Sequence, residues 1–333
     1  MKLAYADIFE IGTRAFTNVG ASKDTAQLVM QALLKAELDG MPSHGLSRIP
    51  FYVAQAKTGK VQAAAEPKVE NPKPAVTLVD ANFGFAYPAI QAGLTRSMPL
   101  AKQYGLAFCG IKHSHHCGML GHVVEQIAQN NLIGLAFSNS PKAMAPWGGQ
   151  KASFGTNPIA FGCPRNGADP IIVDMSLSKV ARGKVMLAKQ QGAKSIPEGW
   201  ALDNLGKPTT DPDKAMAGTM VPMGDAKGAA LALMVEILSA TLTGSNHAFE
   251  ASSLFEAEGP APAIGQSFIL IDPTAINPAF QDYLARLLTH IKDQAGTRLP
   301  GERRFALRAS RLDQPIEVPD PLYAKICALA EQS

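Results

Sequence analysis

The stretch 106-LAFCGIKHSHHCGMLGHVVEQIAQNNLIGLAFS-138 places an apolar strand, a histidine-rich loop, a helix and a second apolar strand in direct succession. Residues 106–111 and 132–138 are apolar runs of strand length, and residues 121–130 between them predict a helix. The turn before this helix lacks the GxGxxG pattern that a dinucleotide-binding Rossmann unit carries at this point. The segment therefore favours an α/β fold that is not of the Rossmann type.

Outside this segment, helical ends flank a strand-rich middle. Residues 1–38 carry apolar side chains at helical spacing and predict two helices, with Ser22 as an N-cap. The proline- and lysine-rich stretch 67–74 predicts a linker. The other expected elements are strands at 75–80, 159–163, 170–176 and 267–272, helices at 48–56, 226–243, 278–293 and the C-terminal end, and a polar loop after residues 190–200.

This arrangement predicts discontinuous domains. Residues 1–70 together with 275–333 are expected to form a mainly helical domain, and residues 75–274 a strand-rich region. The chain of 333 residues also exceeds the roughly 250–300 residues that one hydrophobic core usually serves. Helices and strands do not alternate regularly enough for a TIM barrel or a doubly wound sheet.

The composition limits the partners. Only 18% of the residues are charged, the net charge is +3, and lysines and arginines are dispersed, so no nucleic-acid partner is expected. The apolar runs are far shorter than the roughly 18 residues of a membrane span, and the N-terminal segment does not resemble a signal peptide. Four cysteines are too few for a disulfide framework. We therefore expect a cytoplasmic protein without a membrane partner.

Three histidines and a cysteine stand within the five residues 113–117. A zinc site needs three or four converging ligands, and these side chains are too tightly bunched to converge, so no metal is expected. A redox role for Cys117 lacks a nearby partner cysteine. Two interpretations stay open from the residues alone: the loop supplies an acid–base histidine after a buried strand, or its histidines are ordinary surface residues.

Three other clusters combine polar groups with tight turns. In 39-DGMPSHGLSRIPFY-52, a restarting helix would place His44 and Arg48 on one face, where they could handle a proton and a carboxylate. Helix capping beside a surface arginine explains this pattern equally well. The stretch 147–162 exposes backbone donors before a strand or forms an ordinary hairpin. The glycine-rich helix start at 223–238, with a lysine in its first turn, suits an anion or is simply a buried helix.

Together these clusters resemble one family, the second type of malate/L-lactate dehydrogenase, which includes ureidoglycolate and sulfolactate dehydrogenases and Δ1-piperideine-2-carboxylate/Δ1-pyrroline-2-carboxylate reductases. The resemblance covers almost the whole chain, and SHGLSRIPFY at 43–52 with FGTNPIAFG at 154–162 is its most specific part. It implies an oxidoreductase that uses NAD or NADP on the α-carbon of a small carboxylic acid. It also implies a homodimer with a helical dimerisation domain and a mostly antiparallel, non-Rossmann sheet that binds the cofactor.

The resemblance also assigns roles to single residues. Ser43 looks like the hydroxyl that orients His44, and His44 like the group that donates or accepts the proton. Arg48 looks like the carboxylate anchor, with Thr156 and Tyr52 as further substrate contacts. A second catalytic histidine, His116, is expected to face both nicotinamide and substrate. The residues expected at the cofactor are His116, Gly118, Met119, Leu120, Asp174, Met175, Ser176, Lys227, Arg298 and Arg303.

Two reactions fit this machinery. The first interconverts a 2-oxo acid and a 2-hydroxy acid, and Lys184 in VARGKV resembles the dehydrogenases with that activity. The second reduces a cyclic 2-imino acid, to whose reductases RLPGERR at 298–304 is more similar. Trp147, Met119 and Met144 could line the apolar pocket that such a ring requires, although core packing explains these three side chains equally well. A non-catalytic binding protein and a metal-dependent hydrolase are the competing classes, and the choice between NADH and NADPH stays open.

Overall fold

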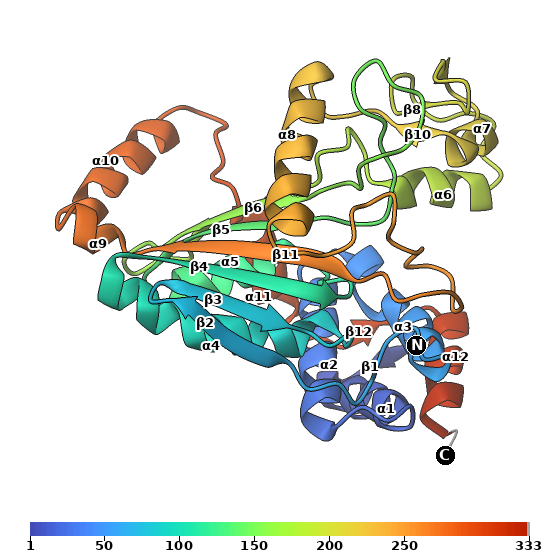
Figure 1. Ribbon diagram of the computed structural model, residues 1–333, viewed down its shortest axis with the longest axis horizontal. Coiled ribbons are helices and arrows are strands. Elements are labelled where there is room, and N and C mark those ends of the chain that lie inside the picture. Colours follow the sequence, from blue (N-terminus) through green and yellow to red (C-terminus); the bar gives the residue numbers. More distant parts are fainter. Residues whose placement is uncertain (332–333) are drawn as a thin grey trace.

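A mixed seven-stranded sheet forms the centre of the molecule (Figure 1). The protein is described by a computed structural model that covers residues 1–331. In spatial order the sheet comprises β2 (Lys68–Lys73), β3 (Val76–Asp80), β4 (Leu106–Ser114), β11 (Ile264–Ile271), β5 (Ile133–Ser138), β6 (Ile159–Cys163) and β7 (Ile171–Met175). Within this described chain, only β3 and β4 pair in parallel, and the other five neighbouring pairs are antiparallel. The prediction of an α/β fold is confirmed.

The parallel pair is connected by helix α4 (Ala86–Tyr104), which crosses over one face of the sheet. Sequence reasoning missed this helix, since Pro99 lies inside it and Gly93 interrupts its apolar pattern. The glycine has a packing reason. A Cβ atom at Gly93 would lie 2.7 Å from the Sγ atom of Cys109 in β4. The helix can therefore approach the sheet closely only with glycine at this position.

Two apolar cores cover the opposite faces of the sheet. Helices α4 and α5 (Leu120–Gln129) pack on one face, and α8 (Ala226–Glu236), continued by a π-helical turn, packs on the other (Figure 1). In β11 the neighbouring residues Phe268 and Ile269 contribute to different cores, as the alternation of side chains along a strand requires.

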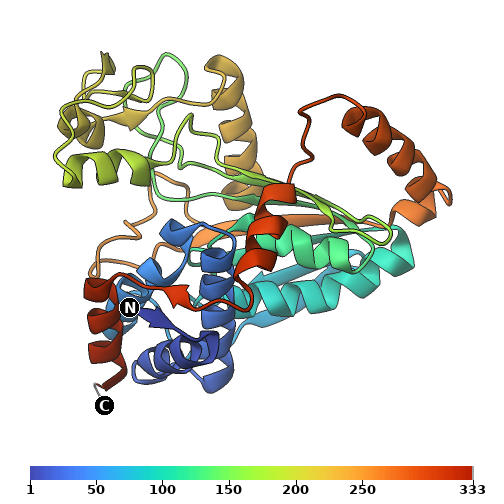
Figure 2. The ribbon, with the colours of Figure 1, turned by 180° about the vertical axis from the view of Figure 1, so that it is seen from behind.

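A body of helices beside the sheet contains both ends of the described chain (Figure 2). As predicted, two helices form within residues 1–38, and the Ser22 side chain caps the second by accepting a hydrogen bond from the amide of Thr25. The short strands β1 and β12 pair and join the two ends of the chain. The elements are β1 (Lys2–Leu3), α1 (Tyr5–Thr17), α2 (Lys23–Leu38), α3 (Ile49–Lys57), β12 (Ile316–Glu317) and α12 (Asp320–Glu331).

Several segments differ from the predictions. Residues 67–74 are not a linker, because β2 pairs with β3 at the sheet edge with all six of its residues exposed. The polar loop after residue 190 contains a small three-stranded sheet, and the helix expected at 226–243 becomes π-helical at Ile237–Thr241. The remaining elements are α6 (Arg182–Gln190), β8 (Ala201–Leu202), β9 (Pro208–Thr209), α7 (Pro212–Ala217), β10 (Thr219–Met220), α9 (Pro273–Ile276), α10 (Phe280–Lys292) and α11 (Glu302–Arg311). Within residues 1–331, no helix combines the length and apolar character that a membrane crossing requires.

Candidate active site

The loop that leaves α2 carries the first group of predicted site residues. Two consecutive 3-10 turns, Pro42–His44 and Leu46–Arg48, connect α2 to α3. The amide of Leu46 donates a hydrogen bond of 2.7 Å to Glu37 Oε1, which ties the loop back to α2. The loop is therefore held at both of its ends by helices of the same body.

The second group lies in the loop between β4 and α5. Gly118 has a φ of +65°, and a Cβ atom there would lie 2.7 Å from the hydroxyl oxygen of Tyr87. Both facts require glycine at this turn. Met119 and Leu120 are buried where α5 begins, so they anchor the loop in the core below it.

The histidines of this loop turn towards different partners. The ring of His113 lies 3.0 Å from Asp80 Oδ1, and His115 Nε2 lies 2.9 Å from Gln55 Oε1. His116 turns towards the α2–α3 loop instead. No group of three or more His, Cys, Asp or Glu side chains among residues 1–331 is arranged to hold a metal ion.

The two loops meet at His44 and His116. Their imidazole rings stack with 5.6 Å between the ring centroids and 30° between the planes. Tyr52 of α3 lies below them, with its hydroxyl 2.6 Å from His116 Nδ1, and Ser43 Oγ lies 3.0 Å from His44 Nδ1. Ser43, His44, Tyr52 and His116 therefore form one connected group from three separate elements.

Both stacked rings are neutral around pH 7. Burial, followed by the charges of Arg48 and His122, lowers the pKa of His44 to about 4. Burial and the charge of Arg48 also hold the pKa of His116 well below its usual value. Burial raises the pKa of Tyr52 to about 12, so its hydroxyl keeps its proton and can donate it to His116 Nδ1. Neutral imidazoles beside a protonated phenol are suited to exchanging protons with a bound ligand.

Arg48 is the cation of this site and is only 9% exposed. Its Nε donates to the Ser43 carbonyl oxygen at 2.7 Å, while its buried NH1 atom has no hydrogen-bond partner. Within the described chain, no carboxylate forms an ion pair with it. A buried guanidinium without a counter-ion is costly unless a ligand supplies the anion, so Arg48 is a natural anion site.

The start of α5 forms a second polar cluster. Asp174 Oδ2, at the end of β7, accepts hydrogen bonds from the Gly121 amide at 2.9 Å and from Arg304 NH2 at 3.2 Å. The NH1 atom of Arg304 is buried without a partner, beside the helix start. The unpaired NH1 atom of Arg304 beside this helix start is a donor that an anion such as a phosphate oxygen would satisfy.

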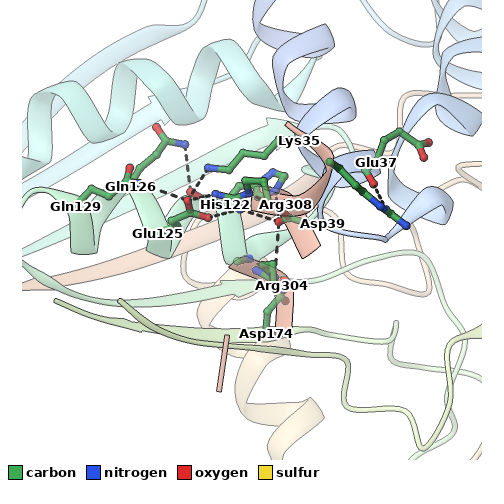
Figure 3. A network of polar contacts seen from close by, with 12 residues as sticks. Lys35, Glu37, Asp39, His122, Glu125, Gln126, Gln129, Asp174, Arg304 and Arg308 are labelled. Carbon is green, nitrogen blue, oxygen red and sulfur yellow. Dashed lines mark hydrogen bonds and ion pairs between the residues drawn. The ribbon is translucent and has the colours of Figure 1, made fainter. Parts of the chain in front are cut away.

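A network of buried charges connects this cluster to α2 (Figure 3). Arg308 of α11 bonds both oxygens of Asp39 and both oxygens of Glu125, at 2.6 and 2.9 Å in each case. Lys35 also pairs with Glu125, and His122 lies 3.3 Å from Asp39. Sequence reasoning missed this network entirely. The only available signal was the arginine-rich 298–304 turn leading into α11.

The turn at Thr156 is stabilised by hydrogen bonds to Ser140 and to the buried side chain of Glu236. The Thr156 amide donates to Ser140 Oγ at 3.0 Å. Its neighbour Asn157, with a φ of +38°, donates at 2.7 Å to Glu236 Oε2. Glu236 Oε1 accepts from the Ala248 amide at 2.7 Å. The turn is therefore built by hydrogen bonds and is more than a simple hairpin.

The other predicted residues lie outside these contacts. Met175 is partly exposed, and Ser176 bonds to Ser178 within its own turn. Lys227 is exposed in the first turn of α8, and Arg298 and Arg303 are exposed before and within α11. Instead, Arg304 and Arg308 of α11 point inwards, where they pair with Asp174 and Glu125.

Trp147 and Met144 do not share one pocket wall. Met144 is fully buried, whereas Trp147 lines a cleft of about 550 Å³ together with Lys179 and Asp225. Met119 is buried at the start of α5. The apolar pocket that the sequence suggested for a ring-shaped substrate is therefore not formed by these three side chains together.

Comparisons with known proteins show which family this chain resembles. The sequence pattern of the malate/L-lactate dehydrogenase family matches residues 3–327. The chain is 51% identical to a (2R)-3-sulfolactate dehydrogenase (NADP(+)) of Chromohalobacter salexigens over 96% of this chain and 95% of that protein. The crystal structure of Δ1-piperideine-2-carboxylate reductase from Pseudomonas syringae superimposes with a TM-score of 0.93 at 35% identity, covering 99% of each chain. Sulfolactate dehydrogenase from Methanocaldococcus jannaschii gives 0.91 at 29% identity, over 100% of this chain and 97% of the other.

Proposed function

This chain belongs to the malate/L-lactate dehydrogenase family, and on that premise we propose that it interconverts a small 2-hydroxy acid and its 2-oxo acid with NADP(H), 3-sulfolactate being the preferred substrate. It is an oxidoreductase that uses a nicotinamide cofactor. The observation that carries the proposal is Arg48, a buried guanidinium without a counter-ion, next to the neutral His44–His116 pair. The 51% identity to a sulfolactate dehydrogenase supports the choice of substrate.

In this proposal Arg48 binds the substrate carboxylate. Its Nε is occupied by the Ser43 carbonyl, so the unpaired NH1 edge receives the anion. Charge-assisted bonds of this kind are short and directional, which places the adjacent α-carbon in a fixed position. Thr156 and Tyr52 remain further proposed substrate contacts.

His44 moves the proton at the α-oxygen. If Nδ1 carries the hydrogen and donates it to Ser43 Oγ, Nε2 is free to take the hydroxyl proton of a 2-hydroxy acid. A pKa of about 4 means that His44 is already the unprotonated base at neutral pH. In the reverse direction His44 returns the proton to the developing alkoxide, and His116, fixed by Tyr52, supports its ring from the other side.

We further propose where the cofactor binds. When bound, the nicotinamide accepts or supplies the hydride of the α-carbon. The turn at Gly118–Leu120 and the segment Asp174–Ser176 would hold it, with the unpaired NH1 of Arg304 available for a phosphate oxygen. The exposed side chains of Lys227, Arg298 and Arg303 remain proposed contacts whose length allows them to reach a phosphate.

A homodimer and two discontinuous domains, residues 1–70 with 275–333 and residues 75–274, belong to the same proposal. The domain that carries His44 would also supply the dimer contact, and the cofactor would bind the mostly antiparallel sheet. The other region, 75–274, offers a second surface for self-association, an exposed apolar stripe on α8 and the turn after it: Leu233, Met234, Ile237 and Leu242. Light scattering during size-exclusion chromatography gives the mass in solution and so tests the dimer. The same proposal places the protein in the cytoplasm.

The second candidate is reduction of a cyclic 2-imino acid. It is favoured by relatives such as the Δ1-pyrroline-2-carboxylate reductase of Burkholderia ambifaria, 36% identical over 99% of this chain. The same Arg48 would hold the carboxylate of that substrate. An iminium carries its own proton and positive charge, however, and needs less help from His44. The neutral acid–base pair therefore favours the hydroxy acid.

A panel of substrates and cofactors tests the proposal. Initial rates are compared for (2R)-3-sulfolactate, malate and lactate with NAD+ and NADP+, and for Δ1-piperideine-2-carboxylate and Δ1-pyrroline-2-carboxylate with NADH and NADPH. We expect the highest kcat/KM for sulfolactate with NADP+. A higher kcat/KM for either imino acid would favour the second candidate, and inactivity with all five would refute both.

Replacing Arg48 tests the carboxylate anchor. Arg48→Met keeps much of the side-chain volume but removes the charge-assisted hydrogen bonds, which are worth about 1.5–3 kcal/mol. We expect kcat/KM to fall about 10- to 150-fold, mainly through a higher KM. Steady-state kinetics with saturating cofactor measure this change. An unaltered KM would remove Arg48 from the site.

A further inference from the structure

The segment 253–258, between the π-helical turn and β11, lies on α3 beside the site. It has no regular secondary structure, yet it is fixed by several hydrogen bonds to residues that follow Tyr52. Thr58 Oγ1 donates to the Ala257 carbonyl at 2.7 Å, and Gln55 Nε2 donates to the Glu256 carbonyl at 3.0 Å. None of its residues was among the predicted site residues.

Lys60 is the main clamp on this segment. Only 2% of this lysine is exposed, and its ammonium donates to the carbonyls of Ser253, Glu256 and Glu258 at 2.6, 3.0 and 3.1 Å. An ammonium group has three donors, so these three carbonyls use all of them. Burying a charged lysine is unfavourable unless its donors are paired, and here the backbone carbonyls of one segment pair all three.

The clamped segment presents Phe255 to Arg48. The guanidinium carbon of Arg48 lies 4.8 Å from the centroid of the Phe255 ring. The ring of Phe51 meets Phe255 edge-on, at 5.7 Å and 90°, and fixes the orientation of its plane. The guanidinium of Arg48 therefore lies over an aromatic ring, while its Nε donates to the Ser43 carbonyl.

The same segment also reaches the histidine loop. Gln55 donates its amide to the segment and uses its Oε1 to bind His115 Nε2, the neighbour of His116. Since Gln55 Oε1 is an acceptor, His115 Nε2 is the donor in this pair. A displacement of the segment would therefore change the contacts of both Arg48 and the histidine loop.

We propose that the segment 253–258 is a wall of the substrate site, in which Phe255 sets the orientation of Arg48 and Lys60 positions Phe255. With Phe255 beside the guanidinium and Nε occupied, the carboxylate is directed to the edge of Arg48 that carries the unpaired NH1 atom. Phe255 thus fixes the direction from which Arg48 binds the carboxylate, and Lys60 acts through Phe255. The inference rests on the proposed function, because it takes Arg48 as the carboxylate anchor.

Substitutions of Phe255 test this wall. Phe255 is 43% exposed, and a cation–π contact at an exposed site is worth about 0.5–1 kcal/mol, so Phe255→Leu should raise KM for the carboxylic acid about 2- to 5-fold. We expect kcat to change much less, because His44 is untouched. Phe255→Trp, which retains an aromatic face, should restore KM to near the wild-type value. Phe249→Leu is the matched control, since Phe249 lies nearby in the sequence, is exposed, and stacks on His247.

Lys60 is tested through its coupling to Phe255. Lys60→Met should raise KM in the same direction, and the double variant Lys60→Met/Phe255→Leu should have a KM no higher than that of the worse single variant. Independent, multiplying effects would show that Lys60 acts only on general stability and would overturn its positioning role. An unchanged KM in Phe255→Leu, with the wild-type enzyme active, would overturn the wall. A wild-type enzyme inactive with every 2-hydroxy acid would instead refute the proposed function.

Discussion

Replacing His44 by glutamine is expected to lower kcat about 10²- to 10⁴-fold, the contribution of one well-placed general acid or base. Glutamine is close in size and can keep a hydrogen bond with Ser43 Oγ, so the loop should fold unchanged. It cannot take the proton of a hydroxy acid. Because His44 stacks on His116 without holding the carboxylate, KM and cofactor affinity should change little.

Stopped-flow turnover and the fluorescence of bound NADPH measure these two quantities separately. The matched control is His247→Gln, since His247 is a partly exposed histidine that bonds to Glu250 and Thr241. It should leave kcat within about twofold, as expected of a surface change. A wild-type kcat in the His44 variant would remove the proposed proton carrier.

The second large effect is on stability and concerns Arg308. Arg308→Met should lower the free energy of unfolding by about 3–5 kcal/mol, because it removes the bidentate partner of two buried carboxylates and leaves them with the ion pairs to Lys35, His122 and Arg304. The side chains of Asp39 and Glu125 have no exposed surface, and both bind Arg308 through two oxygens (Figure 3). Urea titration of the protein without cofactor gives the change.

Two variants make this prediction specific. Arg303→Met, on the same helix but exposed, should change the free energy of unfolding by no more than about 0.5 kcal/mol. Adding Glu125→Gln to Arg308→Met should recover part of the loss, because one uncompensated charge is removed. A fully stable Arg308→Met variant would mean that the network contributes nothing.

The wild-type protein should lose stability as the pH falls below about 6.5. Burial lowers the pKa of His115 to about 3, so the unfolded chain binds that proton first and is favoured by acid. Burial alone would raise the pKa of Asp39 and Glu125. Hydrogen bonds outweigh it, from His122 and Arg308 to Asp39 and from Arg308 to Glu125, and lower both values. Their contribution is present above the unfolded values of 3.8 and 4.5 and is lost below them. The free energy of unfolding, measured by urea titration from pH 7 to pH 3, should therefore fall steadily as the pH is lowered.

The strands were predictable where apolar residues mark a buried face. The edge strand β2 was not, because all six of its residues are exposed and no apolar alternation marks it. Helix α4 was hidden by its internal proline and glycine. The strands of the small sheet, such as Ala201–Leu202, are too short for any period to appear.

Some residues of the candidate site were likewise predictable from the sequence, and others were not. Ser43, His44 and Arg48 are neighbours in the sequence, so a single motif points to them. The contact of Arg308 with Asp39 joins residues 269 positions apart, and that of Lys60 with Ser253 spans 193. One sequence carries no local pattern for such pairs. They follow only once the topology has brought the elements together.

The central claim is that hydride moves directly between the α-carbon and the nicotinamide while His44 handles the proton. Sulfolactate carrying deuterium at its α-carbon tests it most directly, with mass spectrometry of the NADPH that is formed. We predict that the deuterium appears in the reduced nicotinamide and that the initial rate of a single turnover is slowed. Unlabelled NADPH, with the deuterium released to water, would contradict the account.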